Sequence, residues 1–120
     1  MRLTMKLNPK PFEQIANGSK TVEVRLNDLK RRMLHLDDEI VFINTADTTQ
    51  TLTVKVVNLH RFKSFEQLYE TIPLESMGYH PSEVTDAKPS DMEEHYPKDA
   101  DLVNGVLAIE VALCDPIIFD

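Results

Sequence analysis

The chain has 120 residues, of which 42% are hydrophobic and 28% are charged, and it carries a formal net charge of −7. These proportions are ordinary for a globular protein, and the length predicts one domain over residues 1–120 in preference to two. The sequence contains no apolar stretch long enough to span a bilayer, and its start alternates in polarity instead of showing a signal-peptide pattern. We therefore expect a cytoplasmic protein that does not associate with membranes.

Positive charge is concentrated near the N-terminus. Residues 1–32 hold eight lysines or arginines and three acidic residues, a local charge of +5, so the rest of the chain carries −12. The overall acidity argues against nonspecific coating of nucleic acid, because such binding needs many Lys or Arg contacts to phosphates. The cluster instead predicts one positive edge, where a phosphate or carboxylate would be held.

The first 26 residues predict a strand, a helix and a second strand. Apolar and polar residues alternate over 2–7 and again over 21–26, which is typical of strands with one buried face. Between them, Asn8 suits a helix N-cap and Gly18 suits a left-handed helix stop. On the second strand Val22, Val24 and Leu26 would face the core, which leaves the opposite face available.

The next segment predicts a basic loop and a hairpin. The cations at 30–32 follow a strand break and are expected on a loop that returns over the sheet. A turn at 36–39 leads into a strand over 40–44, and a polar turn connects it to a strand over 52–59.

The second half of the chain predicts two helices, an irregular segment and a closing strand. A Ser-x-x-Gln capping pattern opens a helix over 64–72, and Ser90 with Glu93 repeats the pattern for a short acidic helix that ends before Pro97. Residues 79–88 show no clear period and are expected on the surface. The almost continuous apolar run 106–113 fits a strand covered on both faces. The element order predicts an α+β protein with a mixed, curved sheet or small open barrel.

Three segments resemble the ASCH domain family, the activating signal cointegrator homology domains of the PUA-like superfamily. The first is a helix followed by GSKTVEVR, residues 18–25. The second is the turn and strand 36–42, where this chain has Asp37-Asp38 instead of the usual Gly-Asp; Asp tolerates the left-handed conformation better than most residues. The third is Tyr96-Pro97 followed by the run 104–109, similar to the closing strand of compact prokaryotic members.

The resemblance implies a PUA-like small curved β-barrel of mixed strands flanked by short helices, with a basic cleft that binds RNA or a nucleotide-like ligand. Glu23 and Arg25 would form a lateral pair that directs the guanidinium toward this cleft. The bland alternative is a surface ion pair worth ~0–1 kcal/mol. The predicted ligand-binding residues are Lys20, Glu23, Arg25, Asn27, Lys30, Arg31, Arg32 and Tyr96.

The three cations at 30–32 have two interpretations, phosphate contacts or a solvated loop that maintains solubility. Tyr96 likewise has two interpretations. It would stack on a base, or it would anchor the end of a helix in the core.

The resemblance also implies an alternative function. Members of one branch of ASCH-like proteins are amidohydrolases that act on acetylated cytidine through a lysine, a threonine nucleophile and a glutamate. Lys20 matches the lysine, but Glu23 occupies the threonine position and has no hydroxyl to activate. Thr21 is two residues away on the same predicted face, and Glu75 lies near the expected glutamate. The resemblance therefore favours binding over catalysis, with Lys20, Thr21, Glu23 and Glu75 as the catalytic set of the alternative.

No cofactor or metal is expected. The four histidines are scattered without helical ligand spacing, and the three glycines are too dispersed for a phosphate-binding loop. Cys114 is the single cysteine, which excludes an internal disulfide and a cysteine-based zinc cluster. A third possibility is a protein-interaction module whose acidic face, residues 83–101, meets a basic protein partner.

Overall fold

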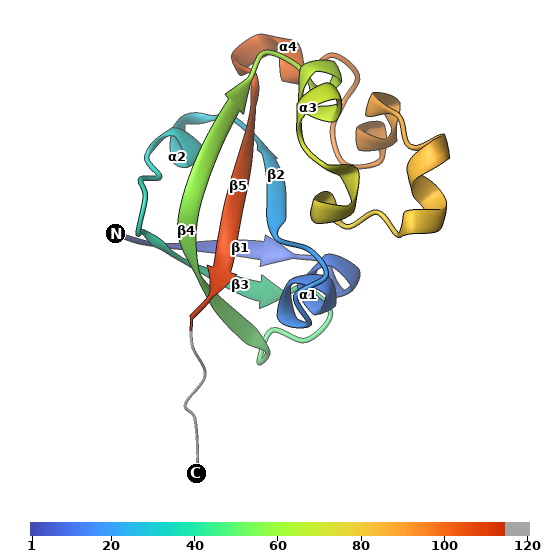
Figure 1. Cartoon of the computed structure of the whole chain (residues 1–120). Helices are drawn as coiled ribbons and strands as arrows, with labels where there is room; N and C mark the ends of the chain where they lie inside the picture. The colour runs from blue at the N-terminus through green and yellow to red at the C-terminus, as the bar shows by residue number, and fades with distance from the viewer. Residues whose placement is uncertain (115–120) are drawn as a thin grey trace.

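The fold is built on one five-stranded sheet with the strand order β1-β3-β4-β5-β2 (Figure 1). The computed structural model describes residues 1–114, and residues 115–120 of the expected domain lie outside this part. The strands are β1 (Arg2–Leu7), β2 (Val22–Leu26), β3 (Glu39–Asn44), β4 (Thr51–Phe62) and β5 (Val106–Leu113). β1 pairs with β3 in parallel, and the other neighbours pair antiparallel.

The sheet curls into a half-barrel, and β4 is the strand about which it bends. Residues 51–55 of β4 pair with β3, and residues 54–62 pair with β5, with a register shift between Val56 and Asn58. Such bulges bend a strand and increase its twist. The expected α+β class with a curved, mixed sheet is therefore confirmed, and so is the hairpin formed by β3 and β4.

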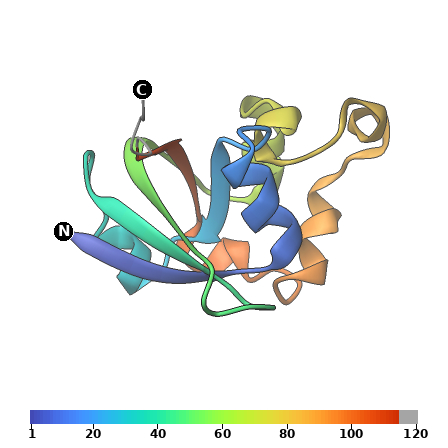
Figure 2. The same ribbon diagram turned by 90° about the horizontal axis from the view of Figure 1, so that it is seen from below.

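Short helices flank the half-barrel. They are the α-helices α1 (Pro9–Ala16), α2 (Leu29–Arg32), α3 (Phe65–Thr71) and α4 (Asp101–Asn104), and the 3₁₀ helices η1 (Leu74–Met77), η2 (Pro81–Asp86) and η3 (Pro89–Glu94). Figure 2 shows α1 between the strands and the helical segment that follows α3, and Gln14 of α1 donates a hydrogen bond to the Gly78 carbonyl at 3.0 Å. None of the described helices is long and apolar enough to cross a membrane.

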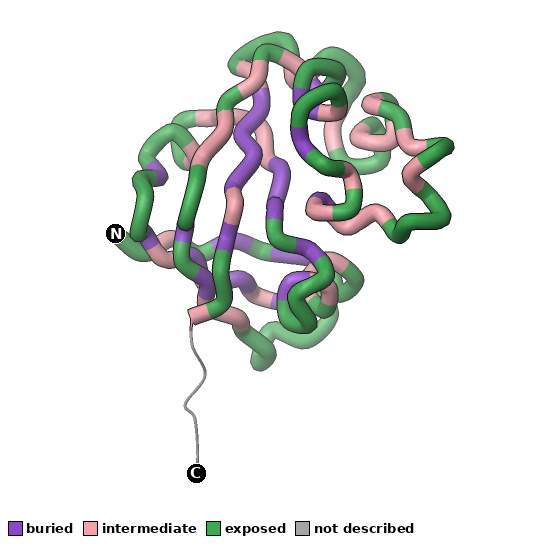
Figure 3. The backbone as a smooth tube through the Cα atoms, viewed as in Figure 1, coloured by how far each residue is buried: buried purple, intermediate pink, exposed green. Residues whose placement is uncertain are grey.

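Two hydrophobic clusters are separated by the sheet, and β5 contributes to both. Leu107, Ile109 and Val111 belong to the cluster inside the half-barrel, together with side chains of β1, β3 and β4. Val106 and Ala108 belong to the cluster beneath α3, together with Val22 and Val24 of β2. Buried residues accordingly run along β5 and β2 in Figure 3. The prediction of a closing strand covered on both faces is confirmed.

Some local predictions were wrong. Residues 30–32 lie on α2 and not on a loop, because the Asp28 carboxylate caps this short helix by accepting from the Arg31 backbone N–H at 3.0 Å. Ser90 does not cap the acidic helix, which is the 3₁₀ helix η3: Asp91 accepts from the Lys88 N–H at 3.2 Å. The irregular segment 79–88 contains η2. Asp37, in contrast, adopts the left-handed conformation expected of it, with φ of 71°.

Gly105, between α4 and β5, has a backbone that only glycine adopts easily, with φ of 81° and ψ of −170°. A Cβ atom here would lie 2.5 Å from the Phe62 carbonyl oxygen. We expect Gly105→Ala to lower the free energy of unfolding by about 3 kcal/mol or more, from backbone strain and overpacking together. Urea denaturation measures this loss.

Gly18→Ala is the matched control. Gly18 also has a positive φ, of 85°, but no atom lies within 4 Å of an added Cβ. Its substitution should cost only about 1–2 kcal/mol of left-handed strain. Equal losses in the two variants would contradict the close approach of Phe62 to Gly105.

Candidate ligand-binding site

A buried cluster of ion pairs lies at the start of β2. The Glu23 carboxylate is 3.2 Å from Lys20 Nζ and 2.8 Å from Arg25 Nε. Glu23 is only 5% exposed and Lys20 only 9%. The expected pair of Glu23 and Arg25 is therefore present. The face that carries Glu23 is not open as predicted, because η1 covers it and its Met77 carbonyl accepts from Lys20 Nζ at 2.8 Å.

The charges around Glu23 decide its ionisation. Burial alone would raise the pKa of the carboxyl group, because a carboxylate loses hydration in the interior. The positive charges of Lys20 and Arg25, with their hydrogen bonds, outweigh burial, and the pKa lies below its usual value of 4.5. Glu23 is therefore ionised at neutral pH, and the cluster carries one net positive charge.

Arg25 also reaches across to the other edge of the sheet. Its Nη2 donates to the Lys6 carbonyl at 2.7 Å, and Lys30 Nζ of α2 donates to the Thr4 carbonyl at 2.9 Å. β1 and β2 are the two edge strands, and carbonyls two residues apart point to the same side of a strand. Arg25 therefore bridges the gap between β1 and β2, which we call the seam, and Lys30 joins α2 to the same edge of β1.

The remaining cations of α2 are held at its N-terminal end. Arg31 Nη1 is 3.1 Å from the Asp28 carboxylate, and its Nε is buried without a hydrogen-bond partner in the described residues. Arg32 Nε donates to the Asn27 carbonyl at 2.9 Å. The side-chain oxygen of Asn27 is likewise buried without a partner there. Both unpaired atoms belong to the predicted binding residues.

Tyr96 joins this cluster from a distant part of the chain. Burial raises the pKa of its hydroxyl, the charges of Arg25 and Arg31 act in the opposite direction, and the charge of Glu23 raises the pKa further. The charges of Arg25, Arg31 and Glu23 therefore all affect the pKa of the Tyr96 hydroxyl. Its ring stacks on Phe65, with centroids 5.8 Å apart. Tyr96 is thus the hydrophobic anchor of the second interpretation, with its polar end directed toward the cluster.

Two residues of the catalytic set expected for the hydrolase alternative are not part of the buried cluster. The side chains of Thr21 and Glu75 are exposed. Within the part of the chain that the structure describes, neither forms a hydrogen bond or ion pair with Lys20, whose Nζ contacts Glu23 and Met77. Lys20 and Glu23 contact each other, whereas no hydrogen bond or ion pair among the described residues joins the Thr21 or Glu75 side chain to either of them.

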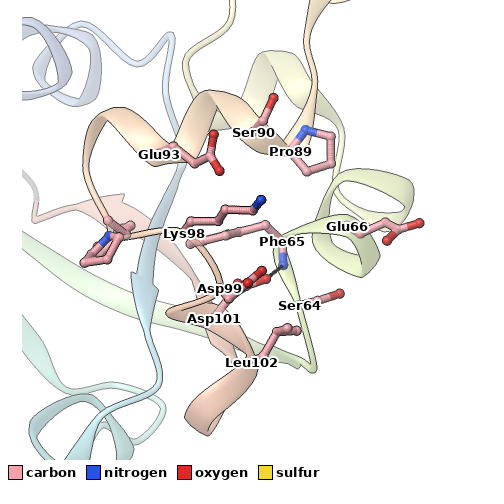
Figure 4. A pocket seen from close by; sticks show the side chains of 12 residues that line it. Ser64, Phe65, Glu66, Pro89, Ser90, Glu93, Lys98, Asp99, Asp101 and Leu102 are labelled. Carbon is pink, nitrogen blue, oxygen red and sulfur yellow. Dashed lines mark hydrogen bonds between the residues drawn. The ribbon is translucent and has the colours of Figure 1, made fainter.

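Lys20, Glu23 and Arg25 line neither of two hollows on the described surface. Lys20 and Glu23 are buried within the ion-paired cluster. One hollow, of about 260 Å³, lies between α3, η3 and α4, and it is acidic, with Glu66, Glu93, Asp99 and Asp101 in its wall beside Lys98 (Figure 4).

The other hollow lies at the end of β4 and contains Arg61 and Lys63, which sequence reasoning missed. Both follow the predicted end of that strand, so no periodic pattern marked them. Of the predicted residues, Tyr96 lines the acidic hollow and Asn27 lines the one at the end of β4.

The central role of Glu23 predicts that Glu23→Gln will be strongly destabilising. The buried Lys20 and the partly buried Arg25 then lack their counter-charge, and breaking a buried pair costs about 3–5 kcal/mol. The pKa of Glu23 is lower in the folded than in the unfolded chain, so its stabilisation is present above about pH 4.5 and is lost as pH falls through the folded value. Urea unfolding at several pH values should show this acid-dependent component in the unaltered protein and its absence in the variant.

Glu39→Gln provides the control. Glu39 accepts from Arg2 Nη2 at 2.8 Å, but the Arg2 side chain is 64% exposed. We expect a clearly smaller loss, since water already solvates this pair. A loss as large as that of Glu23→Gln would show that burial of the cluster is unimportant.

Comparisons with known proteins agree on the fold. The hypothetical protein PH0355, known from a crystal structure, is 28% identical with a TM-score of 0.78, over 95% of this chain and 100% of that one. Protein PF0455 from Pyrococcus furiosus is 27% identical with a TM-score of 0.69, over 97% of this chain and 100% of that one.

A mutant of ZmASCH from Zymomonas mobilis is 14% identical with a TM-score of 0.63, over 91% of this chain and 66% of that one, a likeness of fold alone. No curated protein matches this chain. The model of the ASCH domain matches residues 5–114. The chain therefore belongs to the ASCH domain family.

Proposed function

We propose that this ASCH domain is a binding module for RNA or a nucleotide-like ligand, which it holds at the seam and along α2. The observation that carries the proposal is the convergence of cations from two elements on one strand edge. Arg25 of β2 and Lys30 of α2 donate to carbonyls two residues apart on β1, and Arg31 and Arg32 follow directly on α2. A chain of net charge −7 thus concentrates four cations in one place.

These cations keep hydrogen-bonding capacity for a ligand. A lysine ammonium has three N–H groups and an arginine guanidinium has five. Lys30 and Arg32 are exposed, and each donates one side-chain hydrogen bond among the described residues. Their other N–H groups face water, where phosphate oxygens would accept them, and arginine does so with two parallel bonds.

Glu23 prepares Arg25 for this role. The carboxylate fixes Nε on one side and the Lys6 carbonyl fixes Nη2 on the other, so the guanidinium loses little further freedom when a ligand binds. A side chain held in its bound orientation contributes more to affinity than a mobile one. The cluster thus supports recognition of an anion, and the phosphodiester backbone is the anion that the family resemblance favours.

The double variant Lys30→Ala/Arg32→Ala tests the proposal. Each neutralised phosphate of a single strand contributes about 0.7 to the slope of log affinity against log salt, so the slope should become shallower by about 1.4. The assay is fluorescence anisotropy with a labelled single-stranded RNA at several salt concentrations. Because both side chains are exposed and bond only to carbonyls, the fold should survive, as circular dichroism would verify.

Lys10→Ala/Lys55→Ala is the matched control, because it removes the same charge from exposed positions on α1 and β4. Its salt slope should equal that of the unaltered protein. Equal slopes for all three proteins, or no RNA binding by the unaltered one, would exclude α2 as the binding element.

The alternative function is a small amidohydrolase acting on acetylated cytidine or a related modified nucleoside. One contact favours it, the 3.2 Å approach of Lys20 Nζ to the Glu23 carboxylate, which is a possible acid–base pair. The exposed position of Thr21 and Glu75 weakens it, because a nucleophile must lie within hydrogen-bond reach of its base.

We expect no turnover when a high concentration of the protein is incubated with acetylated cytidine and the release of cytidine is followed by chromatography. Thr21→Ala and Ser19→Ala are a matched pair of exposed hydroxyl deletions near Lys20. Turnover that Thr21→Ala abolishes and Ser19→Ala preserves would establish the hydrolase in place of the binding module.

A further inference from the structure

The hollow at the end of β4 combines positive charge with unused polar groups. It is an open surface hollow of about 640 Å³ between the ends of β2 and β4, α3 and α4. Arg61 and Lys63 are its charged residues, both exposed, and its lining contains no acidic residue. Neither cation forms an ion pair within the described residues. The hollow of Figure 4, with four carboxylates, would instead repel an anion.

Amide side chains also line the same hollow. The Asn27 side-chain oxygen is buried without a hydrogen-bond partner in the described part of the chain, a condition that costs about 1–3 kcal/mol. Gln67 Oε1 accepts from the Lys63 backbone N–H at 2.8 Å, which leaves its amide nitrogen as a donor. Leu102, 62% exposed, offers an apolar surface beside these amides. The free Gln67 amide nitrogen and the Leu102 side chain thus offer a polar and an apolar contact to a nucleobase.

This hollow adjoins the basic helix α2 through one residue. Asn27 lines the hollow with its side chain, and its carbonyl accepts from Arg32 Nε at 2.9 Å. The Asn27 backbone N–H donates to the Gly105 carbonyl, which fixes this residue against another part of the lining. Asn27 therefore lies between the cations of α2 and the hollow that contains Arg61 and Lys63. A single phosphate would contact only one of these two groups of cations, whereas a polyanion would contact both.

We propose that the hollow at the end of β4 is a second nucleotide subsite, and that the ligand is therefore single-stranded RNA and not a mononucleotide. Arg61 and Lys63 bind the phosphodiester backbone, while the free amide nitrogen of Gln67 contacts a base edge. This inference rests on the proposed function, because the first part of the strand occupies the seam and α2.

The test compares two ligands on two double variants. The ligands are a single-stranded RNA of about ten nucleotides, a length within the range that small single-strand-binding folds cover, and cytidine monophosphate. Arg61→Ala/Lys63→Ala should weaken RNA binding and make its salt slope shallower by about 1.4, and should leave binding of the mononucleotide unchanged. Lys30→Ala/Arg32→Ala should weaken both. Arg61→Lys alone should keep the salt slope of the unaltered protein, because both positive charges remain.

The outcomes separate this inference from the function on which it rests. If the unaltered protein binds neither ligand, both fail. If RNA binding is weakened by the α2 variant but is the same in Arg61→Ala/Lys63→Ala and in Lys10→Ala/Lys55→Ala, the proposed function stands and the second subsite is excluded. Equal affinity for single-stranded DNA of the same sequence would overturn RNA as the ligand, because the strand would then be held without its 2′-hydroxyls.

Discussion

The structure depends on the position of Arg25 between a buried carboxylate and the opposite edge of the sheet. The half-barrel is open between β1 and β2, and an open sheet edge leaves backbone groups unpaired. Here the Lys6 carbonyl is satisfied by Arg25 and the Thr4 carbonyl by Lys30, so cationic side chains occupy the place of a missing strand partner. The seam is thereby both bridged and positively charged.

The charged residues consequently divide into two groups with different tasks. Lys20, Glu23 and Arg25 are buried or nearly so, and their charges are committed to one another, to a carbonyl of η1 and to β1. A buried pair of this kind contributes little net stability, since desolvation offsets attraction, but it fixes geometry. Lys30, Arg32, Arg61 and Lys63 are exposed and retain free N–H groups. Affinity for a polyanion would therefore come from the exposed group, and orientation from the buried one.

The sequence predicts what depends on local pattern. Alternating polarity locates β1 and β2, the apolar run locates β5 with both faces covered, and two-residue spacing brings Glu23 and Arg25 into contact. The short helix α2 could also be predicted from the sequence, because Asp28 is a typical N-cap residue. The run of basic residues that follows was interpreted as a loop instead. The order of the elements predicts a mixed, curved sheet or small open barrel, and the ASCH resemblance adds that this barrel is PUA-like.

What the sequence does not predict depends on contacts between distant residues. Glu23 is buried because η1, whose Met77 lies 57 residues beyond Lys20, folds over the start of β2. The hollow at the end of β4 is lined by residues from four separate segments of the chain. Arg61 and Lys63 become part of a hollow only because α4 and Asn27 pack beside them in the fold. Periodicity cannot reveal such sites, since each contributing segment looks ordinary by itself.

The segment that follows η1, residues 79–96, is attached to α3 by polar and aromatic contacts. Tyr79 donates to Asp91 at 2.8 Å and shares a 2.6 Å hydrogen bond with Tyr69 of α3, while Tyr96 stacks on Phe65 of the same helix. Burial raises the pKa of Tyr79, so its phenol stays protonated and remains a donor. α3 therefore anchors both ends of the segment between Tyr79 and Tyr96. Because that segment follows η1 directly, the anchoring also maintains the burial of Glu23, and with it the orientation of Arg25 at the seam.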